Sequence, residues 1–267
     1  MLLNLIEDSV KIHDTTMDYI AFGQGNKPLV ILPGLSLNRV KGAGLSLAYM
    51  YRRFAKEYRV YVFDKKEAVE QGVTIREMAA DTAYVMEQLG IIKAYIFGVS
   101  QGGMIAQYIA MDYPRLVEKL VLAVTLSRQN ESMKSAVDTW IHYAEKKELE
   151  SFVEDMLVRL YSSKYIKKYR LLIPMMIRMS KKADLNRFVI LAKSCFTCET
   201  YNELHKIQCP VLVLGGKQDQ VVTGEASEEI AEKLNCKIFM YEELGHAAYE
   251  EAKDFNERIY TFLQSCD

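Results

Sequence analysis

Short apolar runs recur along most of the chain, with helical patterns between them. The runs are rich in β-branched residues and do not alternate with polar ones, and they lie at 29–32, 60–63, 95–97, 120–124, 211–214 and 237–241. Continuous runs of this kind are typical of strands buried on both faces of a parallel sheet. Before them, residues Ser9 to Gly25 alternate in polarity, which predicts a hairpin of two strands.

Three helices are marked by start and stop signals. Thr74 to Glu77 has the form of a capping box, and Gly90 supplies the stop of the helix that follows. A second helix is expected at 101–112 and ends before Pro114, because the residue preceding a proline is displaced from the α region. The last helix is expected at about 247–263, and it would bury Ala248, Phe255, Ile259 and Phe262. Alternating strands and helices predict an α/β fold whose parallel sheet is covered on both faces.

The strand pattern disappears between residues 127 and 206, where several amphipathic helices are expected instead. This segment is interpreted as an insertion, 127–206, in a core domain formed by 1–126 and 207–267. Its large side chains include Trp140, Tyr143, Phe152, Tyr161, Tyr165, Tyr169, Met175, Met176, Met179 and Phe188. They form the core of the insertion, or some of them line an apolar pocket over the main domain. The basic cluster is interpreted as a solvated face and consists of Lys164, Lys167, Lys168 and Arg170.

Composition and charge narrow the classes of partner. Half of the 267 residues are hydrophobic and 26% are charged, which excludes a disordered or low-complexity chain. The 34 basic and 35 acidic residues leave a net charge of −1, so general electrostatic attraction to nucleic acid or an anionic membrane is absent. We therefore expect a small-molecule substrate as the partner, no nucleic acid and no membrane, and a monomer or a homodimer.

The cysteines and the N-terminal residues favour a reducing, cytoplasmic location. The chain has five cysteines, an odd number, and acids at positions 7 and 8 where a signal peptide would carry positive charge. No apolar run is long enough to span a membrane. Cys195 and Cys198 have the spacing of a redox or metal pair, but no second pair accompanies them, so they are interpreted as packed thiols. No metal is expected.

The segment Gly98-Val-Ser100-Gln-Gly102 matches the pattern GxSxG. It directly follows a predicted strand and directly precedes a predicted helix, which is the setting of a nucleophile elbow. The backbone at such a turn is strained and crowded, and Gly98, Gly102 and Gly103 supply the small residues that it requires. Ser100 would then lie at a helix N-terminus, where free N–H groups favour a developing negative charge.

A serine nucleophile needs a base, and the base needs an orienting carboxylate. Of the four histidines, only His246 follows a predicted sheet strand and precedes a helix; the others are His13, His142 and His205. Asp219 directly follows the strand at 211–214, at the same edge of a parallel sheet. Asp64 also ends a strand, but it precedes Ser100 in the chain and is interpreted as a loop or helix-capping residue.

An oxyanion intermediate requires two preorganised N–H donors. One is expected from the main chain of Gln101, and the second from Leu35 in the loop Pro33-Gly34-Leu35-Ser36. Because both donors are main-chain groups, the side chains of Leu35 and Gln101 are expected to be free to shape the pocket. The candidate catalytic residues are therefore Ser100, Asp219 and His246, with the backbone amides of Leu35 and Gln101.

Several blocks of the chain resemble the α/β-hydrolase fold superfamily. They are the hairpin ending at Gly25, Leu-Pro-Gly-Leu at 32–35, Gly-Val-Ser-Gln-Gly-Gly-Met at 98–104, Cys-Pro-Val-Leu-Val-Leu-Gly-Gly at 209–216, and Gly-His-Ala with Glu250 at 245–250. The resemblance implies a mostly parallel eight-stranded sheet with helices on both faces. It also implies a helical cap inserted after the sixth strand, as in lid-bearing serine hydrolases such as carboxylesterases and ring-cleavage-product hydrolases.

Two positions depart from the family pattern. Pro33 stands where the family usually has histidine, and the Gly-rich loop after Asp64 is replaced by a segment that starts with Lys65 and Lys66. A serine at the nucleophile position disfavours epoxide hydrolase and haloalkane dehalogenase activity.

The sequence thus leads to the hypothesis of a serine hydrolase, a carboxylesterase that cleaves a small to medium, largely apolar ester through an acyl-enzyme without metal or organic cofactor. The alternatives are an acyltransferase or a carbon–carbon bond hydrolase with the same triad, and a non-catalytic ligand-binding protein on the same fold.

Overall fold

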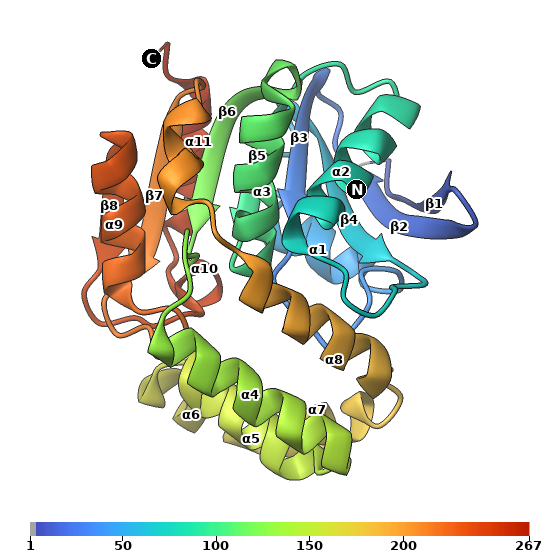
Figure 1. Ribbon diagram of the computed structural model, residues 1–267, viewed down its shortest axis with the longest axis vertical. Helices are drawn as coiled ribbons and strands as arrows, with labels where there is room; N and C mark the ends of the chain where they lie inside the picture. The colour runs from blue at the N-terminus through green and yellow to red at the C-terminus, as the bar shows by residue number, and fades with distance from the viewer. Residues whose placement is uncertain (1–3, 267) are drawn as a thin grey trace.

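The computed structural model describes residues 4–266 and contains an eight-stranded sheet in the order β1-β2-β4-β3-β5-β6-β7-β8 (Figure 1). The strands are β1 (Ile6–Ile12), β2 (Thr15–Phe22), β3 (Lys27–Leu32), β4 (Tyr58–Lys66), β5 (Ala94–Val99), β6 (Val117–Ala123), β7 (Val211–Gly216) and β8 (Lys237–Tyr241). Only the β1–β2 and β2–β4 pairs are antiparallel. The predicted hairpin and the mostly parallel sheet are both confirmed.

Helices cover both faces of the sheet because successive strand residues point to opposite sides. In β3, Val30 and Leu32 belong to the apolar cluster on one face, which includes residues of the helices α2 (Ile75–Gln88), α3 (Gln101–Asp112) and α9 (Gly224–Leu234). Leu29 and Ile31 belong to the cluster on the other face, which includes residues of α11 (Phe255–Gln264) and lies against α1 (Gly44–Met50). A strand buried on both faces has no polar positions, which explains the continuous apolar runs.

The local helix signals are confirmed with one correction. Thr74 accepts a hydrogen bond from the Glu77 amide, the Glu77 side chain accepts one from the Thr74 amide, and α2 starts at the next residue. The expected final helix is instead two pieces, α10 (Ala248–Glu251) and α11. Ala252 adopts an extended conformation that ends α10. The apolar spacing did not reveal this break, since Ala248 in the first piece and Phe255 in the second are both buried.

Five α-helices connect β6 to β7: α4 (Glu131–Lys146), α5 (Leu149–Leu160), α6 (Ser163–Tyr169), α7 (Ile173–Ser180) and α8 (Leu185–Ser194). They lie together beyond the carboxyl ends of the parallel strands (Figure 1). Trp140, Phe152 and Phe188 are buried in the same apolar cluster as one face of the sheet, so these helices pack on the core. The basic cluster of α6 and its neighbour Arg170 is exposed.

The large side chains of the insertion divide between its own core and the cavities next to the sheet. Tyr161, Tyr165, Tyr169, Met175 and Met176 line cavities, whereas the side chain of Met179 lies outside the described part of the structure. Among the helices that the structure describes, none combines the length and the apolar character needed to cross a bilayer.

Candidate active site

Ser100 lies at the sharp turn between β5 and α3, with φ 53° and ψ −119°. A positive φ is costly for a residue with a side chain, of order 1–3 kcal/mol, and persists only where the surroundings impose it. Here the Ser100 amide donates to Ala123 O at 2.9 Å. Thr125 Oγ1 donates to Ser100 O at 2.8 Å. The strand β6 and the loop after it thus hold the peptide units on either side of Ser100.

The glycines of the turn are required by close backbone contacts. A Cβ on Gly102 would overlap the carbonyl oxygen of Leu32, and a Cβ on Gly98 would overlap that of Gly102. A Cβ on Gly103 would lie 2.6 Å from the Cβ of Thr125. The helix α3 can therefore start directly against β3 and β5 only because these positions have no side chain.

The structure brings Ser100, His246 and Asp219 into one chain of hydrogen bonds. His246 Nε2 lies 2.9 Å from Ser100 Oγ, and His246 Nδ1 lies 2.8 Å from Asp219 Oδ2. His246 and Asp219 are buried, at 3% and 7% exposure. Because a carboxylate only accepts, Nδ1 carries the proton, which leaves Nε2 free to accept from the serine hydroxyl.

Asp219 is held in this orientation by its own loop. Its Oδ1 accepts hydrogen bonds from the amides of Val221 at 2.7 Å and Val222 at 3.0 Å, which leaves Oδ2 directed at the imidazole. The loop of His246 is fixed from the other side, since the Ala247 amide donates to Leu160 O at the end of α5. The other three histidines, His13, His142 and His205, are exposed and make none of these contacts.

The two expected oxyanion donors flank Ser100. Gln101 is the first residue of α3, and a Cβ on Gly34 would lie 3.1 Å from Ser100 Cβ, so the Gly34–Leu35 backbone passes directly beside the serine. Among the described residues, neither the Leu35 amide nor the Gln101 amide has a hydrogen-bond partner. Both N–H groups are therefore available to a bound oxyanion.

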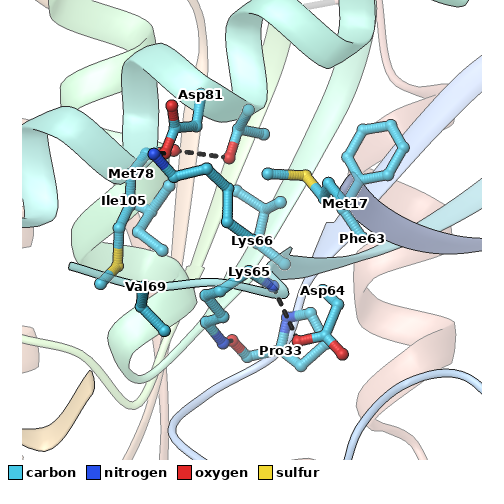
Figure 2. Close-up of a pocket in the computed structure, with 12 residues that line it drawn as sticks. Met17, Pro33, Phe63, Asp64, Lys65, Lys66, Val69, Met78, Asp81 and Ile105 are labelled. Atoms are coloured by element: carbon cyan, nitrogen blue, oxygen red, sulfur yellow. Dashed lines mark hydrogen bonds and ion pairs between the residues drawn. The ribbon is translucent and has the colours of Figure 1, made fainter. Parts of the chain in front are cut away.

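Lys65 anchors the loop that carries Leu35. Its Nζ donates to Pro33 O at 2.7 Å and to Gly34 O at 2.8 Å, and Figure 2 shows its side chain turned toward Pro33. The Gly34 carbonyl and the Leu35 N–H belong to the same peptide unit, and in a trans peptide the two point in opposite directions. Lys65 thus fixes the direction of the Leu35 N–H.

Lys65 is buried at 8% exposure. Burial lowers its pKa to about 8, although the adjacent Asp64 charge opposes this shift and the Arg187 charge adds to it. In the sequence Lys65 is visible only as a departure from the family pattern, because the carbonyls that it binds lie 32 and 31 residues away in the chain.

The interpretation of Asp64 as a loop or helix-capping residue is wrong. Asp64 lies within β4 and is buried, and it pairs with Arg39 at 2.9 Å and with Arg187 of α8 at 3.2 Å. Burial alone would raise its pKa, but the charges of Arg187, Lys65 and Arg39 and the Val40 amide bring it below its usual value. The aspartate therefore joins the insertion to the strand that carries Lys65.

The side chain of Gln101 does not shape the pocket, contrary to expectation. Its Nε2 donates to Leu191 O at 2.7 Å and to Ser194 Oγ at 3.2 Å, so it is buried against α8. Cys195 lies beside it, and burial raises the pKa of that thiol to about 11. Cys198 is also buried and unpaired. Leu35, in contrast, lines the cavity next to Ser100.

A cavity of about 460 Å³ opens beside the turn of Ser100. Gly34, Leu35 and Val99 form the wall next to the serine, and α5 and α7 contribute apolar side chains opposite. Glu250 also lies in this wall. Sequence reasoning included Glu250 only as part of the block around His246, because nothing in the local pattern shows that the side chain points into a cavity.

Comparisons with known proteins agree with this architecture. Residues 27–253 match the family described as "alpha/beta hydrolase fold". The 3-oxoadipate enol-lactonase 2 of Acinetobacter baylyi is 19% identical over 264 residues, which cover 97% of both chains. A putative carbamate hydrolase of Caulobacter vibrioides is 26% identical over 195 residues, 72% of each chain.

Two solved structures share the fold over almost their whole length. The enol-lactonase of Burkholderia xenovorans superposes with a TM-score of 0.84 at 20% identity, over 97% of this chain and 100% of that one. An esterase of Exiguobacterium antarcticum gives 0.82 at 23% identity, over 97% and 100%. The family match covers most of the chain, and the protein therefore belongs to the α/β hydrolase fold family.

Proposed function

We propose that this hydrolase cleaves a small to medium, largely apolar carboxylic ester through an acyl-enzyme, with Ser100 as nucleophile. The observation that carries the proposal is the continuous hydrogen-bond chain from Asp219 through His246 to Ser100, with distances of 2.8 and 2.9 Å. Such a chain activates a hydroxyl that is otherwise a poor nucleophile at neutral pH.

In the acylation step, Ser100 Oγ attacks the ester carbonyl while His246 Nε2 takes the hydroxyl proton. Asp219 stabilises the resulting imidazolium, and the amides of Leu35 and Gln101 donate to the oxyanion. His246 then gives its proton to the alcohol oxygen, and the C–O bond breaks. Water attacks the acyl-enzyme with His246 again as base, and the acid is released from Ser100.

The cavity supports an apolar substrate. Its volume of about 460 Å³ accommodates a small or medium ester, and most of its wall consists of Leu, Met, Val and Tyr side chains. A lactone is a cyclic ester and a carbamate is attacked at the same kind of carbonyl, so the names of the relatives fit this chemistry. We assign 127–206 the role of a cap that closes this cavity over the core formed by 1–126 and 207–267.

The test is hydrolysis of 4-nitrophenyl esters of graded acyl length by the wild type, Ser100→Ala and the exposed-site control Ser135→Ala. We expect Ser100→Ala to lower kcat by about 10³-fold or more, because the triad acts as a unit, and Ser135→Ala to retain wild-type turnover. Mass spectrometry of acid-quenched wild type should show one acyl group on Ser100.

Wild-type turnover by folded Ser100→Ala protein would refute the assignment of the nucleophile. A burst of one product equivalent without steady-state turnover would instead favour a ligand-binding protein.

A further inference from the structure

Two neighbouring cavities share a wall. A second cavity, of about 290 Å³, lies beside the one next to Ser100, and the two have Leu157, Tyr161, Met176 and Glu250 in common. Of the four, Glu250 and Tyr161 are the polar ones, and Tyr161 Oη donates to Glu250 Oε2 at 2.7 Å. A substrate that extends from Ser100 through the first cavity would meet this pair where the second cavity begins.

Glu250 is the only charged residue among the described residues that line the two cavities. The Glu250 side chain is exposed to the cavity. Protein atoms around the carboxylate still desolvate it in part and raise its pKa, whereas hydrogen bonds from Tyr161 and Tyr249 act in the opposite direction. A carboxylate offers about four acceptor positions, so two tyrosine donors leave capacity for a ligand. Among the described residues of the two walls there is no lysine, arginine or histidine to balance the negative charge.

Three tyrosines that line the second cavity, Tyr161, Tyr165 and Tyr169, pack ring against ring and are called the tyrosine ladder. The rings of Tyr161 and Tyr165 stack with centroids 4.6 Å apart, and the rings of Tyr165 and Tyr169 lie 4.4 Å apart. Aromatic faces attract cations through their quadrupole. Lys168 Nζ already occupies one end of the ladder, 4.8 Å from the centre of the Tyr169 ring, so a cationic ligand would use the Tyr161 end, which lies next to Glu250.

The neighbouring acid, Glu251, is bound to the inserted helices and does not line either cavity. Its carboxylate accepts hydrogen bonds from the Ser162 amide at 2.8 Å and from the Ser162 hydroxyl, and it thereby joins α10 to the start of α6. Both oxygens of Glu251 are thus used at this junction, whereas the Glu250 carboxylate binds Tyr161 and also faces the cavity.

Together these contacts point to a ligand class. We propose that Glu250 and the tyrosine ladder bind an organic cation, so that the preferred substrate is an ester whose non-reacting end carries an alkylammonium group. The proposal rests on the serine hydrolase function only for the reacting end; binding of the cation itself is independent of turnover. Cation–π contacts and a carboxylate counter-ion within a mostly apolar wall both favour such a group.

A substrate that carries a negative charge should bind poorly in these cavities. The enol-lactone of 3-oxoadipate keeps a free carboxylate, and in these two cavities it would meet Glu250 and no balancing cation. Arg39 and Arg187 line a third pocket, which shares Ser36, Leu37 and Asn38 with the cavity beside Ser100, but both guanidinium groups pair with Asp64. We therefore expect this chain to discriminate against lactones and esters that carry a carboxylate.

The decisive experiment compares two esters that differ in one atom. Choline butanoate and 3,3-dimethylbutyl butanoate have the same shape, but nitrogen with its positive charge replaces a neutral carbon. The quantity measured is the ratio of their kcat/KM values in wild type, Glu250→Gln and Tyr165→Leu, with Glu243→Gln as an exposed acid control from the nearby loop. In the wild type we expect a ratio of about 10 to 100 in favour of choline butanoate.

We expect the ratio to fall toward one in Glu250→Gln, to fall several-fold in Tyr165→Leu, and to remain at the wild-type value in Glu243→Gln. A second measurement does not require catalysis: calorimetric titration of benzyltrimethylammonium into Ser100→Ala and into the double variant Ser100→Ala/Glu250→Gln. Binding to the first protein and its loss in the second are expected.

The measurements distinguish failure of the cation site from failure of the hydrolase function. If the neutral ester is hydrolysed in a Ser100-dependent way and choline butanoate is no better, the cation site is refuted and the hydrolase function stands. If neither ester is hydrolysed but benzyltrimethylammonium binds only when Glu250 is present, the hydrolase function fails and the cation site stands. Absence of both binding and preference refutes the cation site.

Discussion

The ammonium group of Lys65 fixes two peptide units that lie directly beside Ser100. It donates to the carbonyls of Pro33 and Gly34 and thereby sets the direction of the Leu35 N–H. The positive charge of Lys65 beside the Gly34 carbonyl oxygen also polarises this peptide unit, which makes the Leu35 N–H a stronger donor. Because the position is occupied by a lysine whose neighbours in sequence are also charged, its burial is apparent only from the structure.

We expect Lys65→Met to lower kcat for an ester by about 10- to 100-fold with little change in KM, because displacing the proposed oxyanion donor, the Leu35 N–H, would affect mainly the transition state. Methionine has a similar length and is easier to bury than an ammonium, so the variant should fold. Kinetics of Lys65→Met, with the exposed Lys56→Met as control, provide the measurement. Equal losses in both variants would contradict a specific role of Lys65.

The pH dependence of kcat follows from the same side chain. The pKa of Lys65 is lowered from 10.5 to about 8, so the ammonium is charged below pH 8 and loses its charge as the pH rises through 8. The wild-type kcat should therefore fall several-fold between pH 7 and 9, and the charge-free Lys65→Met should show no fall in this interval. A parallel decline in both proteins would assign the alkaline limb to another group.

At the scale of elements, the turn from β5 into α3 requires close backbone packing, and the glycines of the motif GxSxG make that packing possible. The pattern GxSxG with strand and helix on either side correctly located this turn. Gly98 is required by the nearby Gly102 carbonyl, whereas Gly102 is required by Leu32 of β3. The same kind of local signal identified the capping box of α2. The break between α10 and α11 was missed, because both pieces bury apolar residues at helical spacing and only the extended Ala252 separates them.

Replacement of Gly102 by alanine tests how tightly this turn is packed. A Cβ there would overlap backbone atoms of Leu32, which cannot move away without displacing β3. We expect Gly102→Ala to lower the free energy of unfolding by about 3 kcal/mol or more, as measured by urea denaturation. In the control Gly90→Ala, the new Cβ has open space and only the positive φ of 69° is costly, at about 1–2 kcal/mol. Similar losses in the two variants would contradict the close packing.

At the scale of the whole molecule, three sets of contacts join the inserted helices to the edge of the sheet where Ser100 and His246 meet. Arg187 of α8 pairs with Asp64 and donates to Lys65 O and Lys66 O. The Ala247 amide binds Leu160 O at the end of α5. Ser162 binds Glu251. The insertion thus contacts both the loop of His246 and the strand of Lys65.

We expect Arg187→Met to lower the free energy of unfolding at pH 7 by about 3 kcal/mol, since it leaves a buried carboxylate with less compensation. The exposed Arg178→Met, in the same insertion, should stay within about 0.5 kcal/mol of wild type. Urea denaturation of both variants measures the difference.

The stabilisation that Arg187 gives to the folded protein should decrease as the pH falls. The pKa of Asp64 in the folded protein lies below its ordinary 3.8, so its ion pairs stabilise the fold above that pH and lose their effect as the pH falls through the folded value. The difference between wild type and Arg187→Met should therefore be largest near neutrality and shrink toward pH 3. A difference that does not change with pH would show that lost packing, and not the ion pair, is responsible.

The sequence by itself determined the strands, most helices, the turn at Ser100 and the three members of the hydrogen-bond chain. These features depend on local conformation and on the rule that parallel strands end at one edge of a sheet, so neighbouring residues suffice to recognise them. Only the tertiary structure decided the roles of Lys65, Asp64, Arg187 and Glu250. Their partners lie far away in the chain, and whether a charge is solvated, paired or directed into a cavity depends on what the whole fold places around it.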